Sequence, residues 1–107
     1  MKKLDISALL PLEEGQSRGL DSEPAIFILQ YDGALRAYLN RCPHLGIELN
    51  WRPDEFVEPG GALVVCSTHG ALFKSEDGLC VSGPCQGDRL TALNIEASGD
   101  RTYILLP

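Results

Sequence analysis

Hydrophobic residues occur along this chain in short runs that are separated by turn-forming residues. The clearest runs are residues 25–31 and 34–39, which flank the dipeptide Asp32-Gly33. Asp-Gly supplies the positive φ angles that a type I′ turn requires. This stretch therefore predicts a β-hairpin.

The middle of the chain contains three more short runs of strand-forming residues. Residues 63–65 are rich in β-branched side chains and predict a strand that leads directly into Cys66. Residues 71–74 and 79–81 flank a turn at residues 75–78, which predicts another hairpin.

The C-terminal part predicts a closing hairpin, and helical patterns are scarce. Residues 90–97 and 102–106 read as strands joined by a turn at residues 98–101. Only residues 6–10 and the region around 53–57 suggest a helical turn. We find no internal repeat and no low-complexity segment, so the pattern predicts an all-β protein.

Length and charge restrict the possible functions. A chain of 107 residues predicts a single domain, and a metal site adds useful stability at this size. The formal net charge of −6 argues against nucleic acids and anionic membranes as partners, because phosphates favour lysine and arginine. Asp5 and residues 11–14 interrupt any signal-like apolar run, and no segment predicts a membrane span. We therefore expect a cytoplasmic protein.

Candidate chemistry is concentrated in two clusters that have the same order of cysteine and histidine. These are Cys42-Pro43-His44-Leu45-Gly46 and Cys66-Ser67-Thr68-His69-Gly70. Two thiolates and two imidazoles suit either a tetrahedral zinc ion or a [2Fe-2S] cluster in which histidines replace two thiolates. Cys42 and His44 are separated by only one residue, which fits a zinc knuckle poorly. Each pair taken separately has an alternative interpretation as ordinary packed or solvated side chains.

Residues from about 41 to 87 resemble a Rieske protein. Cys-x-His and Cys-x-x-His match the two ligand loops of that family, and residues 70–73, the turn at Asp77-Gly78 and the segment Ser82-Gly83-Pro84 resemble its other features in order. The resemblance implies an antiparallel β sandwich or barrel base, formed by residues of about 1–40 and 88–107. A small cluster-binding subdomain at about 41–87 would be inserted in this base.

The resemblance also implies ligands and a role. Cys42 and Cys66 would hold the inner iron of one [2Fe-2S] cluster, and His44 and His69 would hold the outer iron with their remaining nitrogens facing solvent. Such a protein carries one electron from a donor reductase to an acceptor enzyme, either a terminal oxygenase or a reductase such as nitrite reductase. We expect a monomer with no enzymatic activity of its own. The alternatives are a zinc-stabilised interaction module and a cluster-based redox or iron sensor.

The residues around the proposed cluster add three expectations. High-potential Rieske proteins have serine and tyrosine hydroxyls where this chain has Ala71 and Phe73, which implies a reduction potential at the low end of the family range. We expect Cys80 and Cys85 to pack as small hydrophobes, although a strained disulfide or a redox pair is also compatible with their spacing. The gap of 21 residues between His44 and Cys66 contains Trp51 and Phe56. These aromatic residues predict either a local core or an exposed docking patch.

Overall fold

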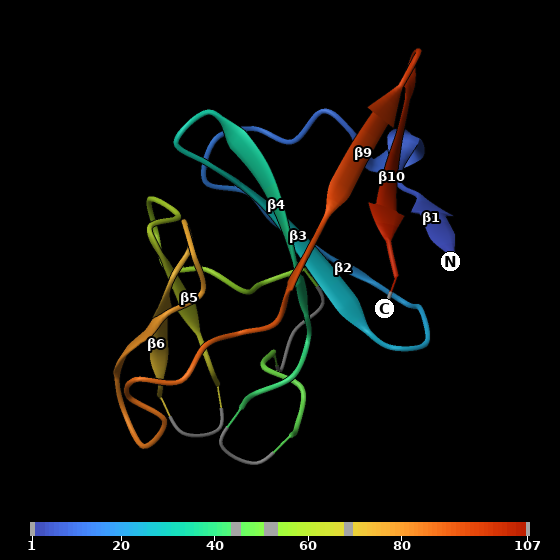
Figure 1. Cartoon of the computed structure of the whole chain (residues 1–107). Coiled ribbons are helices and arrows are strands. Elements are labelled where there is room, and N and C mark those ends of the chain that lie inside the picture. Colours follow the sequence, from blue (N-terminus) through green and yellow to red (C-terminus); the bar gives the residue numbers. More distant parts are fainter. Residues whose placement is uncertain (1, 44–45, 51–53, 68–69, 107) are drawn as a thin grey trace.

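The computed structural model describes residues 2–43, 46–50, 54–67 and 70–106, and the described chain forms three antiparallel sheets (Figure 1). The first sheet has the strand order β2, β3, β4, β8, with bounds Ser17–Leu20, Ile26–Tyr31, Ala34–Leu39 and Ala92–Leu93. The second has the order β1, β10, β9, with bounds Lys3–Asp5, Arg101–Leu105 and Ile95–Ser98. The third contains β5, β6 and β7, with bounds Leu63–Val65, Leu72–Lys74 and Cys80–Ser82.

The predicted central hairpin is confirmed. Strands β3 and β4 pair from Ile26↔Leu39 to Tyr31↔Ala34, which leaves two residues for the turn. Those residues, Asp32 and Gly33, have φ angles of 53° and 73°, as a type I′ turn requires. The strands at 63–65, 71–74 and 79–81 are also present within one residue of their predicted ends.

Two predictions about local structure are wrong. The strand expected over 90–97 divides into β8, which pairs with β4, and β9, which pairs with β10, so that the chain passes between two sheets at Asn94. The described part of the helical turn expected at 53–57 is not helical. Asp54 has a φ of 65°, and the Oδ1 atom of Asp54 accepts a hydrogen bond from the backbone N–H of Gly19 in β2. Binding to the edge of β2 replaces the helical turn, whereas the turn predicted at 6–10 is the 3-10 helix η1 at Ser7–Leu9.

Strand β3 separates two hydrophobic clusters. Ile26 and Ile28 contribute to a cluster in the base that includes Ile6 and Ile104, whereas Phe27 contributes to a second cluster that contains Cys42 and Cys66. All four residues from Ile26 to Leu29 are buried, because both faces of this strand are covered. No helix in the described parts of the chain is long and apolar enough to cross a membrane.

Candidate metal centre

The two candidate cysteines lie in loops with the same backbone hydrogen bonds. The N–H of Gly46 donates to the carbonyl of Cys42 at 2.7 Å, and the N–H of Gly70 donates to the carbonyl of Cys66 at 2.8 Å. Both glycines have φ angles near +70° (71° and 69°), a conformation that glycine adopts without strain. Each cysteine N–H in turn donates to the carbonyl five residues later, at 2.7 Å for Cys42 and 2.9 Å for Cys66. The described residues of the two motifs therefore make matching backbone bonds. We call the two segments the first and second ligand loops (residues 42–47 and 66–71), after the role predicted for them from the sequence.

Both cysteine side chains of the ligand loops are completely buried. Cys42 and Cys66 are each 0 % exposed and belong to one hydrophobic cluster of residues, so both thiols are shielded from water. His44 and His69 lie outside the described residues. Within the described residues, no group of three or more histidine, cysteine, aspartate or glutamate side chains is gathered closely enough to hold a metal.

A buried asparagine connects the ligand loops and was not predicted from the sequence. The Oδ1 atom of Asn40 accepts a hydrogen bond from the N–H of Leu49 at 2.8 Å, and the Nδ2 atom of Asn40 donates to Asn50 at 2.9 Å. The carbonyl of Leu49 accepts from the N–H of Ser67 at 2.8 Å. Asn40 thus holds the segment that contacts the second ligand loop. Its position two residues before Cys42 was the only available signal.

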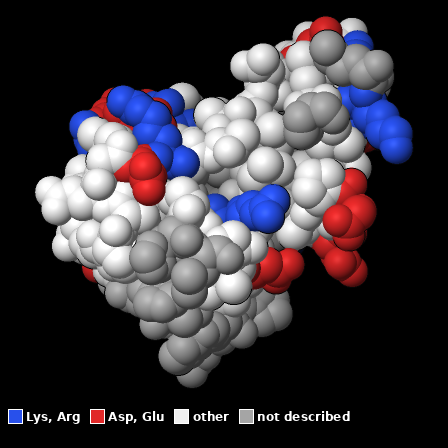
Figure 2. All heavy atoms as spheres, turned by 60° about the horizontal axis from the view of Figure 1, so that its bottom comes forward, with Lys and Arg blue, Asp and Glu red and all other residues white. Residues whose placement is uncertain are grey.

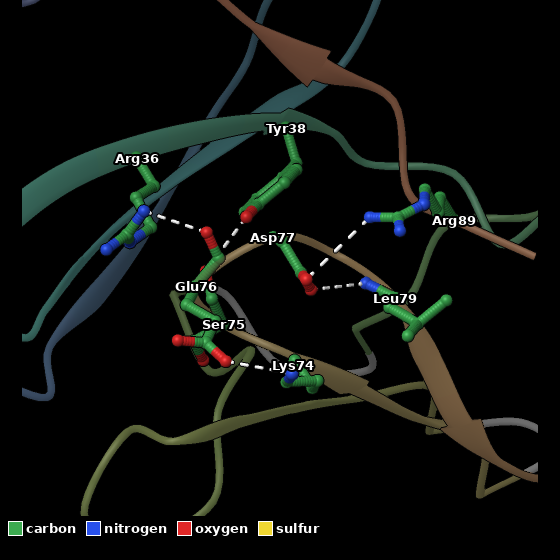
Figure 3. Close-up of polar contacts among 8 residues, drawn as sticks. All are labelled: Arg36, Tyr38, Lys74, Ser75, Glu76, Asp77, Leu79 and Arg89. Carbon is green, nitrogen blue, oxygen red and sulfur yellow. Dashed lines mark hydrogen bonds and ion pairs between the residues drawn. The ribbon is translucent and has the colours of Figure 1, made fainter.

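Side chains of β4 form hydrogen bonds with the turn that follows β6, and these bonds connect β4 to the sheet of β5, β6 and β7 (Figure 3). The Tyr38 hydroxyl donates to the carbonyl of Ser75 at 2.8 Å, and Arg36 Nη1 donates to the carbonyl of Glu76 at 2.8 Å. On the same turn, Asp77 accepts from the N–H of Leu79 at 3.0 Å and lies 3.7 Å from Arg89. The buried contact of Tyr38 sets the position of the strands that precede and follow the second ligand loop.

Phe56 belongs to the core and not to an exposed patch. Its ring is 1 % exposed and stacks on Phe27, with centroids 4.4 Å apart and planes at 4°. Of the two predictions for this aromatic residue, the exposed patch is wrong for Phe56, which is buried in the large hydrophobic cluster that contains Phe27 and not in a separate core of its own loop. Trp51 lies outside the described residues.

The wall behind Cys42 contains apolar side chains and the two remaining cysteines. Ala71 and Phe73 are 0 % exposed, and both belong to the cluster that contains Cys42. Cys80 and Cys85 are buried in the same cluster of residues, and their thiols are not joined by a disulfide. Burial, followed by the neighbouring Cys80 and Cys42, raises the pKa of Cys85 to about 12.

In Figure 2, much of the described surface beside the residues drawn in grey is uncharged. Acidic side chains lie to one side of it, and one basic group lies near its centre. The described exposed residues of the two ligand loops are Pro43, Gly46 and Gly70, and the exposed Arg41 precedes the first loop. Apart from Arg41, they bear no charge.

Three antiparallel sheets that carry two matched cysteine loops define a small all-β protein of the metal-binding or cluster-binding class. The chain belongs to the Rieske family, because the family model described as Rieske [2Fe-2S] domain matches residues 5–96. Membership of this family implies one [2Fe-2S] cluster per domain. The curated proteins with which the chain was compared contain no match.

Solved structures show the same fold at low sequence identity. A ferredoxin from Sphingomonas yanoikuyae B1 has a TM-score of 0.69 and 20% identity, and the match covers 99% of this chain and 98% of that one. A chain from the complex of reduced oxygenase and oxidized ferredoxin in carbazole 1,9a-dioxygenase has a TM-score of 0.68 and 18% identity, and the match covers 96% of this chain and 90% of that one. The terminal oxygenase of carbazole 1,9a-dioxygenase from Novosphingobium sp. KA1 has a TM-score of 0.74 and 18% identity, and the match covers 98% of this chain but 29% of that one. The fold confirmed by these matches is the predicted antiparallel Rieske fold.

Proposed function

We propose that this protein is a one-electron carrier that holds its [2Fe-2S] cluster through Cys42, His44, Cys66 and His69. The observation that supports it best is the matched pair of ligand loops, each of which begins with a buried cysteine and brackets one histidine in sequence. Family membership supports the same ligand set, because two thiolates and two imidazoles are the donors of a Rieske cluster.

The donor set fits the cluster chemically. When bound, a [2Fe-2S] cluster supplies a reversible one-electron couple. Cys42 and Cys66 would provide the two thiolates, and their complete burial excludes water from that side of the site. His44 and His69 would provide the imidazoles. The backbone N–H groups of Cys42 and Cys66 donate to backbone carbonyls of their own loops, so backbone hydrogen bonds within the protein hold the two loops in shape.

We further propose that the electron donor is a reductase and that the acceptor is a terminal oxygenase. One structural neighbour is a ferredoxin in a complex with an oxygenase, which supports an acceptor of this class. The uncharged part of the described surface in Figure 2 would suit a transient contact with such partners, with acidic side chains beside it. In this role the chain has no catalytic residue, and a monomer suffices for it.

The first experiment measures iron, acid-labile sulfide and zinc on freshly purified protein, together with an electron paramagnetic resonance spectrum after dithionite reduction. Two irons and two sulfides per chain with a Rieske-type signal are expected for the proposed cluster. Zinc alone, after anaerobic reconstitution has been attempted, would instead make the chain an interaction module. Fast and reversible oxidation without loss of the cluster would distinguish a carrier from a sensor.

Two variants test the ligand assignment. Replacing His44 or His69 by cysteine leaves four donors but removes one imidazole, so the Rieske-type spectrum should change while iron binding persists. The matched control is Cys85→Ser. This change alters a buried thiol in the hydrophobic cluster that also contains Cys42 and Cys66, and it should keep the Rieske-type signal. An unchanged signal in both histidine variants contradicts the proposed ligands.

A further inference from the structure

Two thiols that electron transfer does not use are in direct contact. The Sγ atoms of Cys80 and Cys85 are 3.2 Å apart, and each residue is 2 % exposed. Cys80 Sγ also lies 3.3 Å from the carbonyl oxygen of Ser82 and donates its proton there. In the contact between the two sulfur atoms, either thiol can be the donor.

The backbone already closes the loop between these two cysteines. The N–H of Cys80 donates to the carbonyl of Asp88 at 2.8 Å, and the N–H of Gly87 donates to the carbonyl of Cys80 at 3.1 Å. The N–H of Asp88 donates to the carbonyl of Cys85 at 2.8 Å. These bonds hold the backbones of both cysteines in place. The two sulfur atoms, which are 3.2 Å apart, would need to approach by only about 1 Å to form a covalent bond.

We propose that Cys80 and Cys85 form a second redox site, a dithiol that a peroxide oxidises reversibly to a disulfide. In this reaction two S–H bonds and the O–O bond of hydrogen peroxide break, one S–S bond forms, and the two thiol protons leave with the peroxide oxygens as two molecules of water. Two electrons pass from the sulfur atoms to the peroxide. A thiol reductant reverses the reaction by exchange.

The position of the pair determines how it would react. Every residue from Val81 to Arg89 except Cys85 is exposed, so a small oxidant reaches the sulfurs when this surface segment opens. Both thiols are buried, so oxidation should be slow and should favour a small neutral oxidant over a bulky disulfide. The same loop contains Gly83, which packs against Ala71 of the second ligand loop, and a disulfide would hold this contact in place.

Alkylation and mass spectrometry of the cluster-loaded protein test the proposal. The protein is treated with hydrogen peroxide under an inert atmosphere, catalase removes the excess, and the chain is unfolded and alkylated with iodoacetamide. The untreated chain should take up four alkyl groups, one for each cysteine. The treated chain should take up two, and peptide mapping should show a link between Cys80 and Cys85 that dithiothreitol removes. The visible absorbance of the cluster is followed in parallel.

Variants and alternative products make the result decisive. Cys80→Ser and Cys85→Ser should each keep all three remaining alkylation sites after the same treatment. The proposal is overturned if the treated wild-type chain still takes up four alkyl groups, if sulfinic acids form in place of a link, or if the link joins Cys85 to Cys42. The mapping of the wild-type chain decides this even if a serine variant does not fold. A Cys80–Cys85 link in a chain that binds no iron would refute the electron carrier and leave this proposal standing.

Discussion

Asn40 and Leu49 join the two ends of the segment that carries the first ligand loop: the buried Oδ1 atom of Asn40 accepts a hydrogen bond from the N–H of Leu49 at 2.8 Å. Leu49 is completely buried, and its carbonyl accepts from Ser67 in the second ligand loop. One side-chain amide therefore holds the residue whose carbonyl accepts a hydrogen bond from the second ligand loop. We infer that Asn40 positions the loops relative to each other.

Replacing Asn40 by alanine should destabilise the protein and accelerate loss of iron. The change leaves the buried N–H of Leu49 without its partner, which costs about 1–3 kcal/mol of unfolding free energy. Asn40→Asp is the matched control, because it keeps the accepting oxygen and should fall between the wild type and the alanine variant. Urea unfolding and the rate of iron transfer to a chelator measure the two effects. An alanine variant that loses stability but releases iron at the wild-type rate would show that Asn40 has only a structural role.

Gly83 and Gly87 provide a matched pair for testing the contact with the second ligand loop. Both have positive φ angles, 104° and 95°, so alanine at either position introduces backbone strain of about 1–2 kcal/mol. A Cβ atom on Gly83 would lie 2.8 Å from the Cα atom of Ala71, whereas one on Gly87 has no neighbour within 4 Å. Gly83→Ala should therefore cost about 1–3 kcal/mol more than Gly87→Ala in urea unfolding. Equal losses would mean that the loop moves away from Ala71 without cost.

Phe56→Ala should remove a large part of the stability of the protein. The ring is buried and stacks on Phe27, so truncation leaves a cavity and is expected to cost about 3–5 kcal/mol. Val81→Ala is the control, because Val81 is 39 % exposed and its truncation should change stability by about 0.5 kcal/mol or less. Thermal unfolding followed by circular dichroism measures both. A Phe56→Ala variant with wild-type stability would contradict the role of this ring in the core.

The sequence predicted the parts of the fold that local chemistry determines. Asp32-Gly33 determines its hairpin because few dipeptides adopt two consecutive positive φ angles, and the order of cysteine and histidine identified the family. The division of residues 90–97 between two sheets was missed, because alternating side chains do not reveal which partner strand each half will bind. The helical turn expected around residues 53–57 was wrong because Asp54 binds Ser17 and Gly19 in β2. These partners are 37 and 35 residues away, so the local sequence does not reveal them.

Asp5 should make the base of the protein sensitive to acid. Hydrogen bonds from Ser7, and then Arg101, lower the pKa of Asp5 to about 2, against about 4 in an unfolded chain. Because the folded-state pKa is the lower one, the stabilisation is complete above about pH 4 and is lost as the pH falls toward 2. The stability difference between the wild type and Asp5→Asn should therefore be present at pH 6 and shrink below pH 4. Unfolding of both proteins at matched pH tests this, and a difference that does not depend on pH would contradict it.

Phe73→Tyr tests whether the apolar wall around Cys42 keeps the reduction potential low. Phe73 and Ala71 are completely buried in the cluster of residues that contains Cys42 and Cys66, and neither can donate a hydrogen bond from its side chain. Hydrogen bonds to cluster sulfurs raise the potential, so we expect the wild-type value near the low end of the family range of roughly −150 to +300 mV. Phe73→Tyr should raise the potential, as should Ala71→Ser, which serves as a second variant if the larger side chain is not accommodated. Protein-film voltammetry measures both, with Val81→Ala as the unaffected control. A wild-type potential well above zero, or no shift in either hydroxyl variant, would show that these two positions do not control the potential.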